Sequence, residues 1–203
     1  MFSLVTKLTE EKNKMTYQLF SDPRFHDLLI QIDIELANIA RQKGCRHCGG
    51  KLHSSPYPRS PFGLPEKFRE YYQSRFSLCC ENCRRRTTPP SVRFFGRRWF
   101  PAPLFILISS LSMVPSERRC AAIHKHFGVR VSKTTWKRWR NWWHTYFPVS
   151  SFWKQFSGLF NSEMPLFPFP RNILNTYQGP LFDRLIIILK LLSPITITIY
   201  HAV

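Results

Sequence analysis

The chain has 203 residues, of which 30 are Lys or Arg and 12 are Asp or Glu, so its formal net charge is +18 at pH 7. A hydrophobic content of 43% and an aromatic content of 15% exclude a disordered basic tail, and the scarcity of acids argues against a carboxylate-rich catalytic metal site. This excess of cations predicts a polyanionic partner, first nucleic acid and second an anionic membrane surface.

The first predicted element is a helix over 23–42, within an N-terminal segment of residues 1–44. Asp22 is a suitable N-cap, Pro23 occupies the first helical position and Gly44 follows the end. Apolar residues recur at helical spacing and predict one stripe made of Phe25, Leu28, Leu29, Ile32, Leu36 and Ile39. Such a stripe packs on the protein's own core or, as the alternative, forms a homodimer contact.

Two Cys-x-x-Cys pairs follow in a segment, residues 45–101, that is rich in Pro, Gly and Arg. They are Cys45 with Cys48 and Cys80 with Cys83. Two such turns supply the four sulfurs of a closed tetrahedral site, so we expect one structural zinc ion per chain. Cys79 is an alternative to Cys80, although only Cys80 preserves the spacing. The Pro-rich residues 54–65 allow the long spacer between the pairs to loop out.

Residues 102–148 predict a domain of three helices, at 104–114, 117–127 and 133–147. Ser116 and Ser132 are N-caps of the second and third helices, and Gly128 ends the second. Residues 149–203 predict one short apolar helix near 182–192. We therefore expect a mainly α fold with an N-terminal helix, a small β zinc ribbon, a three-helix helix-turn-helix unit and a short C-terminal helix.

The third helix of this unit predicts two different faces. One face carries aromatic residues, namely Trp136, Trp139, Trp143 and Tyr146, and the other carries Lys133, Thr134, Lys137, Arg138, Asn141 and His144. This division suits a helix that packs through its Trp face and lies in the major groove of DNA through the other. We expect base contacts from Lys133, Thr134, Lys137 and Asn141, and phosphate contacts from Arg138 and Arg140. A solvated charged face over an aromatic core is the alternative.

A second set of cations follows the cysteine pairs. We expect it to contact phosphates, and it consists of Arg84, Arg85, Arg86, Arg93, Arg97 and Arg98. Residues 82–140 hold 14 of the Lys and Arg residues and one acid, Glu117. The positive charge is therefore concentrated on the two parts that we expect to contact DNA.

The order of these parts resembles the N-terminal zinc-ribbon and helix-turn-helix half of bacterial insertion-sequence transposases. The likeness covers about residues 45–147 and includes Cys45-x-x-Cys48-Gly, Cys80-x-x-Cys83 followed by Arg-Arg-Arg-Thr-Thr-Pro, and Ser91-Val92-Arg93-Phe94. The sequence is also similar to small stand-alone proteins found with mobile elements. The resemblance implies a bacterial, nucleoid-associated protein that recognises element-end duplex DNA and has a transposase or recombinase as partner.

The catalytic half of such transposases has no counterpart in this sequence. It is a ribonuclease-H-like domain with three metal-binding carboxylates, whereas residues 148–203 contain only Glu163 and Asp183 as acids. The acids of the first helix, Asp22, Asp27, Asp33 and Glu35, have the spacing of a solvated face. We therefore expect a DNA-binding protein that is not an enzyme. The alternatives are a divergent or partner-dependent transposase or recombinase subunit, and an RNA-binding zinc-ribbon protein.

The sequence predicts a cytoplasmic protein without a membrane partner. Its longest apolar runs, 104–111 and 185–192, are shorter than the roughly 20 residues that a membrane-spanning helix needs. Residues 1–14 are rich in Lys and Glu and lack the apolar core of a signal peptide.

Overall fold

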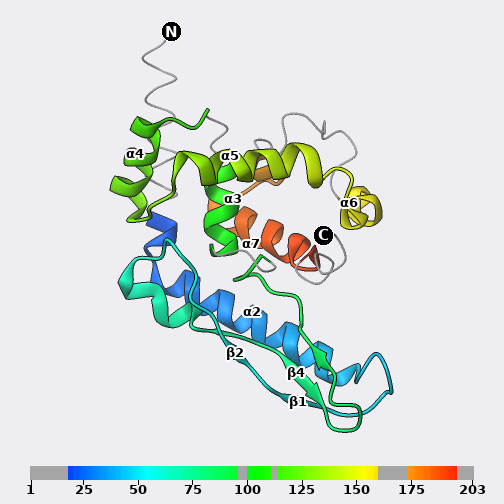
Figure 1. Ribbon diagram of the computed structural model, residues 1–203. Coiled ribbons are helices and arrows are strands. Elements are labelled where there is room, and N and C mark those ends of the chain that lie inside the picture. The colour runs from blue at the N-terminus through cyan, green and yellow to red at the C-terminus, as the bar shows by residue number, and fades with distance from the viewer. Residues whose placement is uncertain (1–17, 96–99, 111–113, 160–172, 196–203) are drawn as a thin grey trace.

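The computed structural model describes residues 18–95, 100–110, 114–159 and 173–195. Within these residues the protein is mainly helical and carries two small antiparallel sheets. Figure 1 shows the strands at one end of the molecule and most of the helices at the other. A long helix, α2 (Pro23–Gln42), runs between the two ends. No helix of the described residues is both long and apolar enough to cross a bilayer.

Helix α2 has the predicted bounds because local chemistry defines its start. The Asp22 carboxylate accepts the backbone N–H of Arg24 at 3.0 Å, which satisfies one of the free donors of the first turn. The predicted apolar stripe is buried at Leu29 and Ile32 but does not extend to Ile39, whose side chain is 48% exposed. The N-terminal half of the stripe therefore packs on the protein's own core.

One acid of α2 lies where the sequence did not place it. Asp33 is fully buried, so the expectation that it belongs to a solvated face is wrong. Its carboxylate accepts hydrogen bonds from the Ser91 hydroxyl (2.7 Å), the Val92 N–H (2.7 Å) and the Arg93 guanidinium (2.8 Å). These contacts join α2 to the connection between the strands and the remaining helices.

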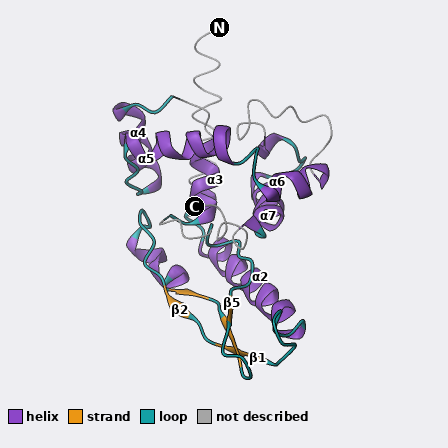
Figure 2. Ribbon diagram, turned by 45° about the vertical axis from the view of Figure 1, so that its right-hand side comes forward, coloured by secondary structure: helices purple, strands orange, loops and turns teal. Residues whose placement is uncertain are grey.

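The strands form one end of the molecule, as Figure 2 shows. A three-stranded antiparallel sheet has the order β1-β4-β5, with β1 (Leu52–Ser54), β4 (Leu78–Cys80) and β5 (Arg86–Thr87). A second, two-stranded sheet pairs β2 (Tyr57–Pro58) with β3 (Ser74–Arg75). The spacer between the cysteine pairs therefore has structure of its own, and its short helix η1 (Glu66–Tyr72) packs against α2.

The remaining helices form the other end. They are α3 (Ala102–Ser110), α4 (Glu117–Phe127), α5 (Lys133–Asn141), α6 (Ser151–Phe156) and α7 (Leu181–Leu192). The predicted caps are confirmed: the Ser116 hydroxyl accepts Arg119 N–H (3.4 Å) and the Ser132 hydroxyl accepts Thr135 N–H (3.1 Å). Gly128 ends α4 in the left-handed conformation that the turn requires, at φ 66°. Helix α6 was not predicted.

The helix that begins with α5 does not continue in regular form to Phe147. Residues Trp142–Tyr146 form a wider π-helical turn. The wider turn shifts the side chains within it and after it around the helix axis, relative to a regular α-helix. Tyr146, which the sequence placed on the Trp face, is consequently 58% exposed, whereas Trp143 stays buried.

One large core holds the molecule together and draws on all four predicted segments. Its members include Phe25, Phe68, Phe105 and Leu185, so the segments do not each enclose a separate core. Phe105 of α3 lies near the centre, and the rings of Phe95, Trp139, Trp142 and Trp143 surround it at centroid distances from 5.1 to 5.6 Å. A much smaller apolar cluster surrounds the cysteine pairs.

Candidate metal centre and nucleic-acid surfaces

The four predicted cysteine ligands lie together. The sulfurs of Cys45, Cys48, Cys80 and Cys83 are all within 4.8 Å of one another. The Cys45 and Cys83 sulfurs are 3.5 Å apart, and those of Cys48 and Cys80 are 3.4 Å apart. A tetrahedral zinc site with Zn–S bonds of about 2.3 Å spaces its sulfurs by about 3.8 Å. The four side chains are therefore close enough to hold a metal ion.

The two cysteine turns have the same backbone hydrogen bonds. In the first turn the N–H of Gly49 donates to the Cys45 carbonyl (2.8 Å), and in the second the N–H of Arg84 donates to the Cys80 carbonyl (3.1 Å). In both turns the first cysteine donates its own N–H to the carbonyl five residues later, at 2.9 and 3.0 Å. The backbone is in the left-handed conformation at both Gly49 (φ 71°) and Arg84 (φ 58°). The second turn thus repeats the first with Arg in place of Gly.

The backbone of these turns stabilises thiolates, but only in part. The N–H groups of His47 and Cys48 lower the pKa of the Cys45 thiol to about 6. At Cys83 the N–H of Arg85 also favours the thiolate, but burial and the neighbouring thiols outweigh it and raise the pKa to about 12. Several thiolates at this distance repel one another. A divalent cation among them would relieve that repulsion, so the donor set fits a soft metal ion.

The alternation of side chains along β4 separates Cys80 from Cys79. Cys80 is fully buried among the other three ligands, whereas Cys79 is on the opposite face of the strand. The Cys79 thiol lies 3.5 Å from the Arg84 carbonyl and is outside the four-thiol group. The geometry therefore favours Cys80 over its alternative.

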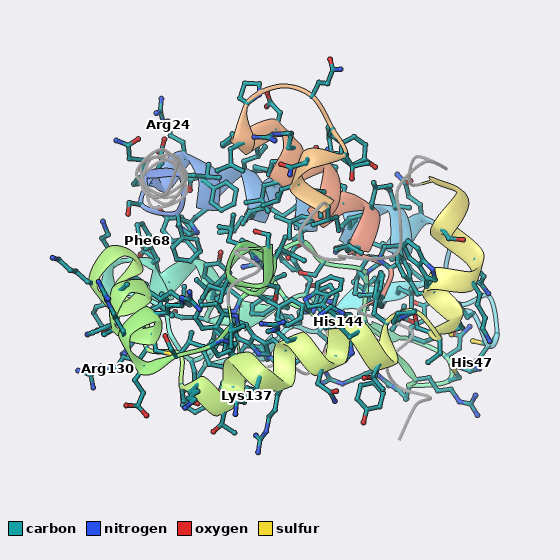
Figure 3. All side chains as sticks on the ribbon, turned by 90° about the horizontal axis from the view of Figure 1, so that it is seen from above. Arg24, His47, Phe68, Arg130, Lys137 and His144 are labelled. Carbon is teal, nitrogen blue, oxygen red and sulfur yellow. The ribbon has the colours of Figure 1, made fainter. Side chains whose placement is uncertain are left out.

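Helix α5 has the two faces that the sequence predicts. Trp136 and Trp139 are 0% and 4% exposed and pack in the core, whereas the opposite face is exposed along its length. The exposed residues are Lys133, Thr134, Lys137, Arg138 and Asn141. Figure 3 shows Lys137 directed away from the body of the molecule. Arg140, which we expected to contact phosphate, is half-buried.

The turn that precedes α5 is anchored in the core. Val129 and Val131 are buried, and Arg130 between them is exposed. The two buried valines anchor the start of the helix, from which five of the six predicted contact residues of α5 project. Anchoring of this kind is a requirement for reading base edges, because each contact must reach a defined atom.

The six arginines of the second predicted set do not lie on one surface. Arg84, Arg85 and Arg86 are exposed beside the four cysteines, and Arg97 and Arg98 lie outside the described residues. Arg93 is only 4% exposed, and it donates to Asp33 and to the Tyr71 and Ser74 carbonyls. The prediction that Arg93 contacts phosphate is therefore wrong. Its apolar neighbours in the sequence, Val92, Phe94 and Phe95, were the available signal of burial.

Sequence reasoning also missed a buried histidine. His26 of α2 is fully buried, with its Nε2 2.9 Å from the Phe20 carbonyl and its Nδ1 3.1 Å from the Tyr72 hydroxyl. Because a carbonyl only accepts, Nε2 carries the proton, and Nδ1 accepts from the tyrosine. Burial lowers the pKa of His26. The ring is thus a neutral part of the core.

Comparisons of the chain with protein-family models, with curated proteins and with solved structures found no match.

Proposed function

We propose that the protein is a zinc-stabilised DNA-binding protein of transposon origin, which reads duplex DNA with α5. In this proposal α4, the turn after Gly128 and α5 form a helix-turn-helix, and the cysteine end is a zinc ribbon. The observation that carries the proposal is the division of α5, with buried Trp136 and Trp139 behind an exposed face of cations and hydrogen-bond donors.

The chemistry of that face suits the major groove. Lys and Asn donate to the acceptors that guanine and adenine present there, and Thr makes both polar and methyl contacts. Arg138 and the exposed Arg130 of the turn can reach phosphates on either side of the groove. An α-helix enters the major groove of B-DNA but not the deep, narrow major groove of A-form RNA. We therefore favour duplex DNA over structured RNA.

Zinc fits the cysteine end because four thiolates in a closed arrangement are the ligand set of structural zinc sites. Cys45, Cys48, Cys80 and Cys83 would hold the ion. It would supply folding free energy to an end of the molecule that has few apolar residues of its own. A four-sulfur site leaves no coordination position for water, so we assign it no catalytic role.

Selection of bound sequences from a random duplex library, followed by sequencing, tests the proposal. We expect a defined motif for the wild type. Lys137→Ala should lose roughly 1–3 kcal/mol of discrimination at one base position. Asn141→Ala should lose less, because the Thr145 hydroxyl already donates to the Asn141 side-chain oxygen at 3.1 Å.

Arg24→Ala is the matched control, because Arg24 is exposed and lies on the other side of the molecule from Lys137 (Figure 3). It should keep the wild-type motif. Failure of the wild type to enrich any duplex, together with tighter binding to structured RNA in competition, would overturn the proposal in favour of an RNA-binding protein. Cleavage of the selected duplex by the purified chain would instead show a catalytic subunit.

A further inference from the structure

The exposed cations of the cysteine end form a surface that is separate from α5. We define this surface as the tip, residues 43–51 and 79–87, and its cations are Lys43, Arg46, Lys51, Arg84, Arg85 and Arg86, all exposed. Its one acid, Glu81, accepts a hydrogen bond from His53 at 2.9 Å. Zinc with four thiolates adds a charge of 2−, so the cations still outnumber the negative charges by two to one.

The backbone at Arg84 indicates that the cation is there for more than structure. The residue has φ 58°, a left-handed conformation that costs free energy for any residue with a Cβ atom. In the first cysteine turn Gly49 occupies the equivalent position without that cost. No ion pair among the described residues includes Arg84. A strained, exposed and unpaired arginine is therefore available to an external anion.

The tip and the start of α5 lie toward opposite ends of α2, and the length of α2 is close to the repeat of DNA. The tip follows the C-terminal end of α2, and α4 with the start of α5 lies toward the other end of α2 (Figure 1). A helix of the length of α2 spans about 30 Å, and B-DNA presents the same face about every 34 Å. In Figure 3 His47 of the tip and Lys137 of α5 both lie on the lower side of the view, opposite Arg24.

We infer that the tip is a second DNA contact, which binds phosphates about one helical turn away from the groove that α5 occupies on the same duplex. This inference rests on the proposed function. Arginine forks match phosphate oxygens. Arg85 and Arg86 each use one guanidinium nitrogen on His47 Nδ1 (2.7 Å) and the Ser55 carbonyl (3.2 Å), and each has further N–H donors for a phosphate. The tip would fix the orientation and register of the protein on DNA and add affinity without reading bases.

Duplex length tests the inference. A DNA hairpin with a stem of 8 base pairs is about 27 Å long, too short to reach α5 and the tip together, whereas a duplex of 24 base pairs reaches both. The triple variant R84A/R85A/R86A is compared with the wild type on each, as a ratio of affinities. The ratio removes the statistical advantage of the longer DNA.

On 24 base pairs we expect the triple variant to bind at least about tenfold more weakly at 0.1 M salt. The slope of log affinity against log salt should fall by about 3, one unit for each lost phosphate contact. On the hairpin both quantities should stay close to wild type, because charges more than about 10 Å from the DNA are screened at this salt concentration. The charge-matched control R24A/K154A/K190A removes three exposed cations elsewhere. Its affinity for the duplex, as a ratio to the wild type, should fall less than that of R84A/R85A/R86A, and its affinity ratio for the hairpin should also change less than the tenfold loss of the triple variant on the duplex.

A second variant separates DNA contact from folding. Arg84→Gly removes one cation and also relieves the strain of the left-handed backbone, so the variant should keep the metal. It should bind the 24-base-pair duplex more weakly but the hairpin as the wild type does. On the duplex, the slope of log affinity against log salt should fall by about 1. Retained metal in this variant excludes loss of the fold as the cause.

Three results would overturn the inference. They are an equal loss by the triple variant on hairpin and duplex, no loss on either, and a stoichiometry of two 24-base-pair duplexes per wild-type chain, which would assign the tip to a separate DNA. A wild type that binds neither DNA would instead refute the proposed function.

Discussion

The two ends of the molecule achieve order in different ways. The helical end surrounds Phe105 with aromatic rings and buries nearly all of α3. The apolar cluster at the cysteine end has only Leu52 and Leu78 besides its cysteines as buried members. Burial of apolar surface contributes about 25 cal/mol per Å², so two leucines cannot offset the entropy of ordering the short strands around them. From this difference we expect the helical end to depend on packing and the cysteine end to depend on a bound metal ion.

Removal of one metal ligand should have the largest effect and should be confined to one end. We expect Cys80→Ser to abolish zinc binding, because it removes one of the four sulfur ligands. The cysteine end would then lose folding free energy on the order of 10 kcal/mol, which structural zinc sites contribute in small domains. Amides of β1 and β4 should lose protection from hydrogen exchange, whereas amides of α3 should keep it, because their core includes no cysteine ligand. Metal analysis and exchange mass spectrometry measure the two effects.

Cys79→Ser is the matched control for this experiment. It changes the adjacent residue of the same strand, whose thiol is outside the four-thiol group. The variant should retain about one zinc per chain. Equal loss of metal in both variants would contradict the ligand assignment, and loss of α3 protection in Cys80→Ser would contradict the independence of the two ends.

The joint between the two ends should give the next largest effect. Asp33 and Arg93 form a buried ion pair that links α2 to the connection from β5 to α3. Asp33→Ala leaves the Arg93 charge buried without its partner, so we expect a loss of about 3–5 kcal/mol in the free energy of unfolding. Urea titration followed by Trp fluorescence measures it. Glu35→Ala, an exposed acid of the same helix, should cost less than about 0.5 kcal/mol.

Acid should weaken the helical end through His26. Burial lowers the pKa of this ring below its ordinary value of 6.5, so the unfolded chain binds a proton more readily than the folded chain. His26 therefore does not change the stability above pH 6.5, and it lowers the stability as the pH decreases from 6.5 toward the pKa of the folded state. His26→Gln keeps a donor and an acceptor but does not titrate, so its stability should change less with pH.

Both proteins contain the cysteine site, so its contribution to the pH dependence of stability is the same in the wild type and in His26→Gln and does not affect the comparison. His124→Gln is the control, because His124 is exposed. It should follow the wild-type dependence on pH. Unfolding curves at pH 7 and pH 5 give the free energy of unfolding at each pH. If this free energy changes equally with pH in the wild type and in His26→Gln, His26 is not the titrating group.

The features that the sequence predicted are those that depend on neighbours along the chain. The capping residues act within three or four residues of their own positions, and the helix ends that they define are confirmed. They are Asp22, Ser116, Ser132 and Gly128. The cysteine cluster was predictable because each Cys-x-x-Cys turn is a local structure. Only the meeting of the two turns is a long-range event, and the ligand chemistry itself requires it.

The features that the sequence did not predict depend on distant contacts. Asp33 and Arg93 are 60 residues apart. The apolar neighbours of Arg93 signal its burial, but nothing near either residue identifies the other as its partner. The π-helical turn lets Trp142 and Trp143 both approach Phe105, so it depends on the packing of a helix from elsewhere in the chain. The sequence showed which helix faces were aromatic or cationic, but not where the regular period of α5 would end.

The smallest predicted effect concerns Arg84 and compares the two cysteine turns directly. The left-handed conformation costs about 1–2 kcal/mol for a residue with a Cβ atom, and the extra flexibility of glycine in the unfolded chain offsets about 0.5–1 kcal/mol. Arg84→Gly should therefore stabilise the metal-bound tip by about 0.5–1 kcal/mol. Competition with a zinc chelator measures this, because folding of the tip and metal binding are linked.

Arg84→Ala keeps the strained backbone and removes only the charge, so its zinc affinity should equal that of the wild type. The mirror change, Gly49→Ala, should weaken zinc binding by about the same amount that Arg84→Gly gains, because its new Cβ has space around it and the cost comes from the backbone alone. Weaker zinc binding in Arg84→Gly would mean that the arginine side chain stabilises the tip, and the strain at φ 58° would then have a structural cause. Tighter zinc binding with weaker DNA binding would show that the second turn gives up stability for a cation that the first turn does not need.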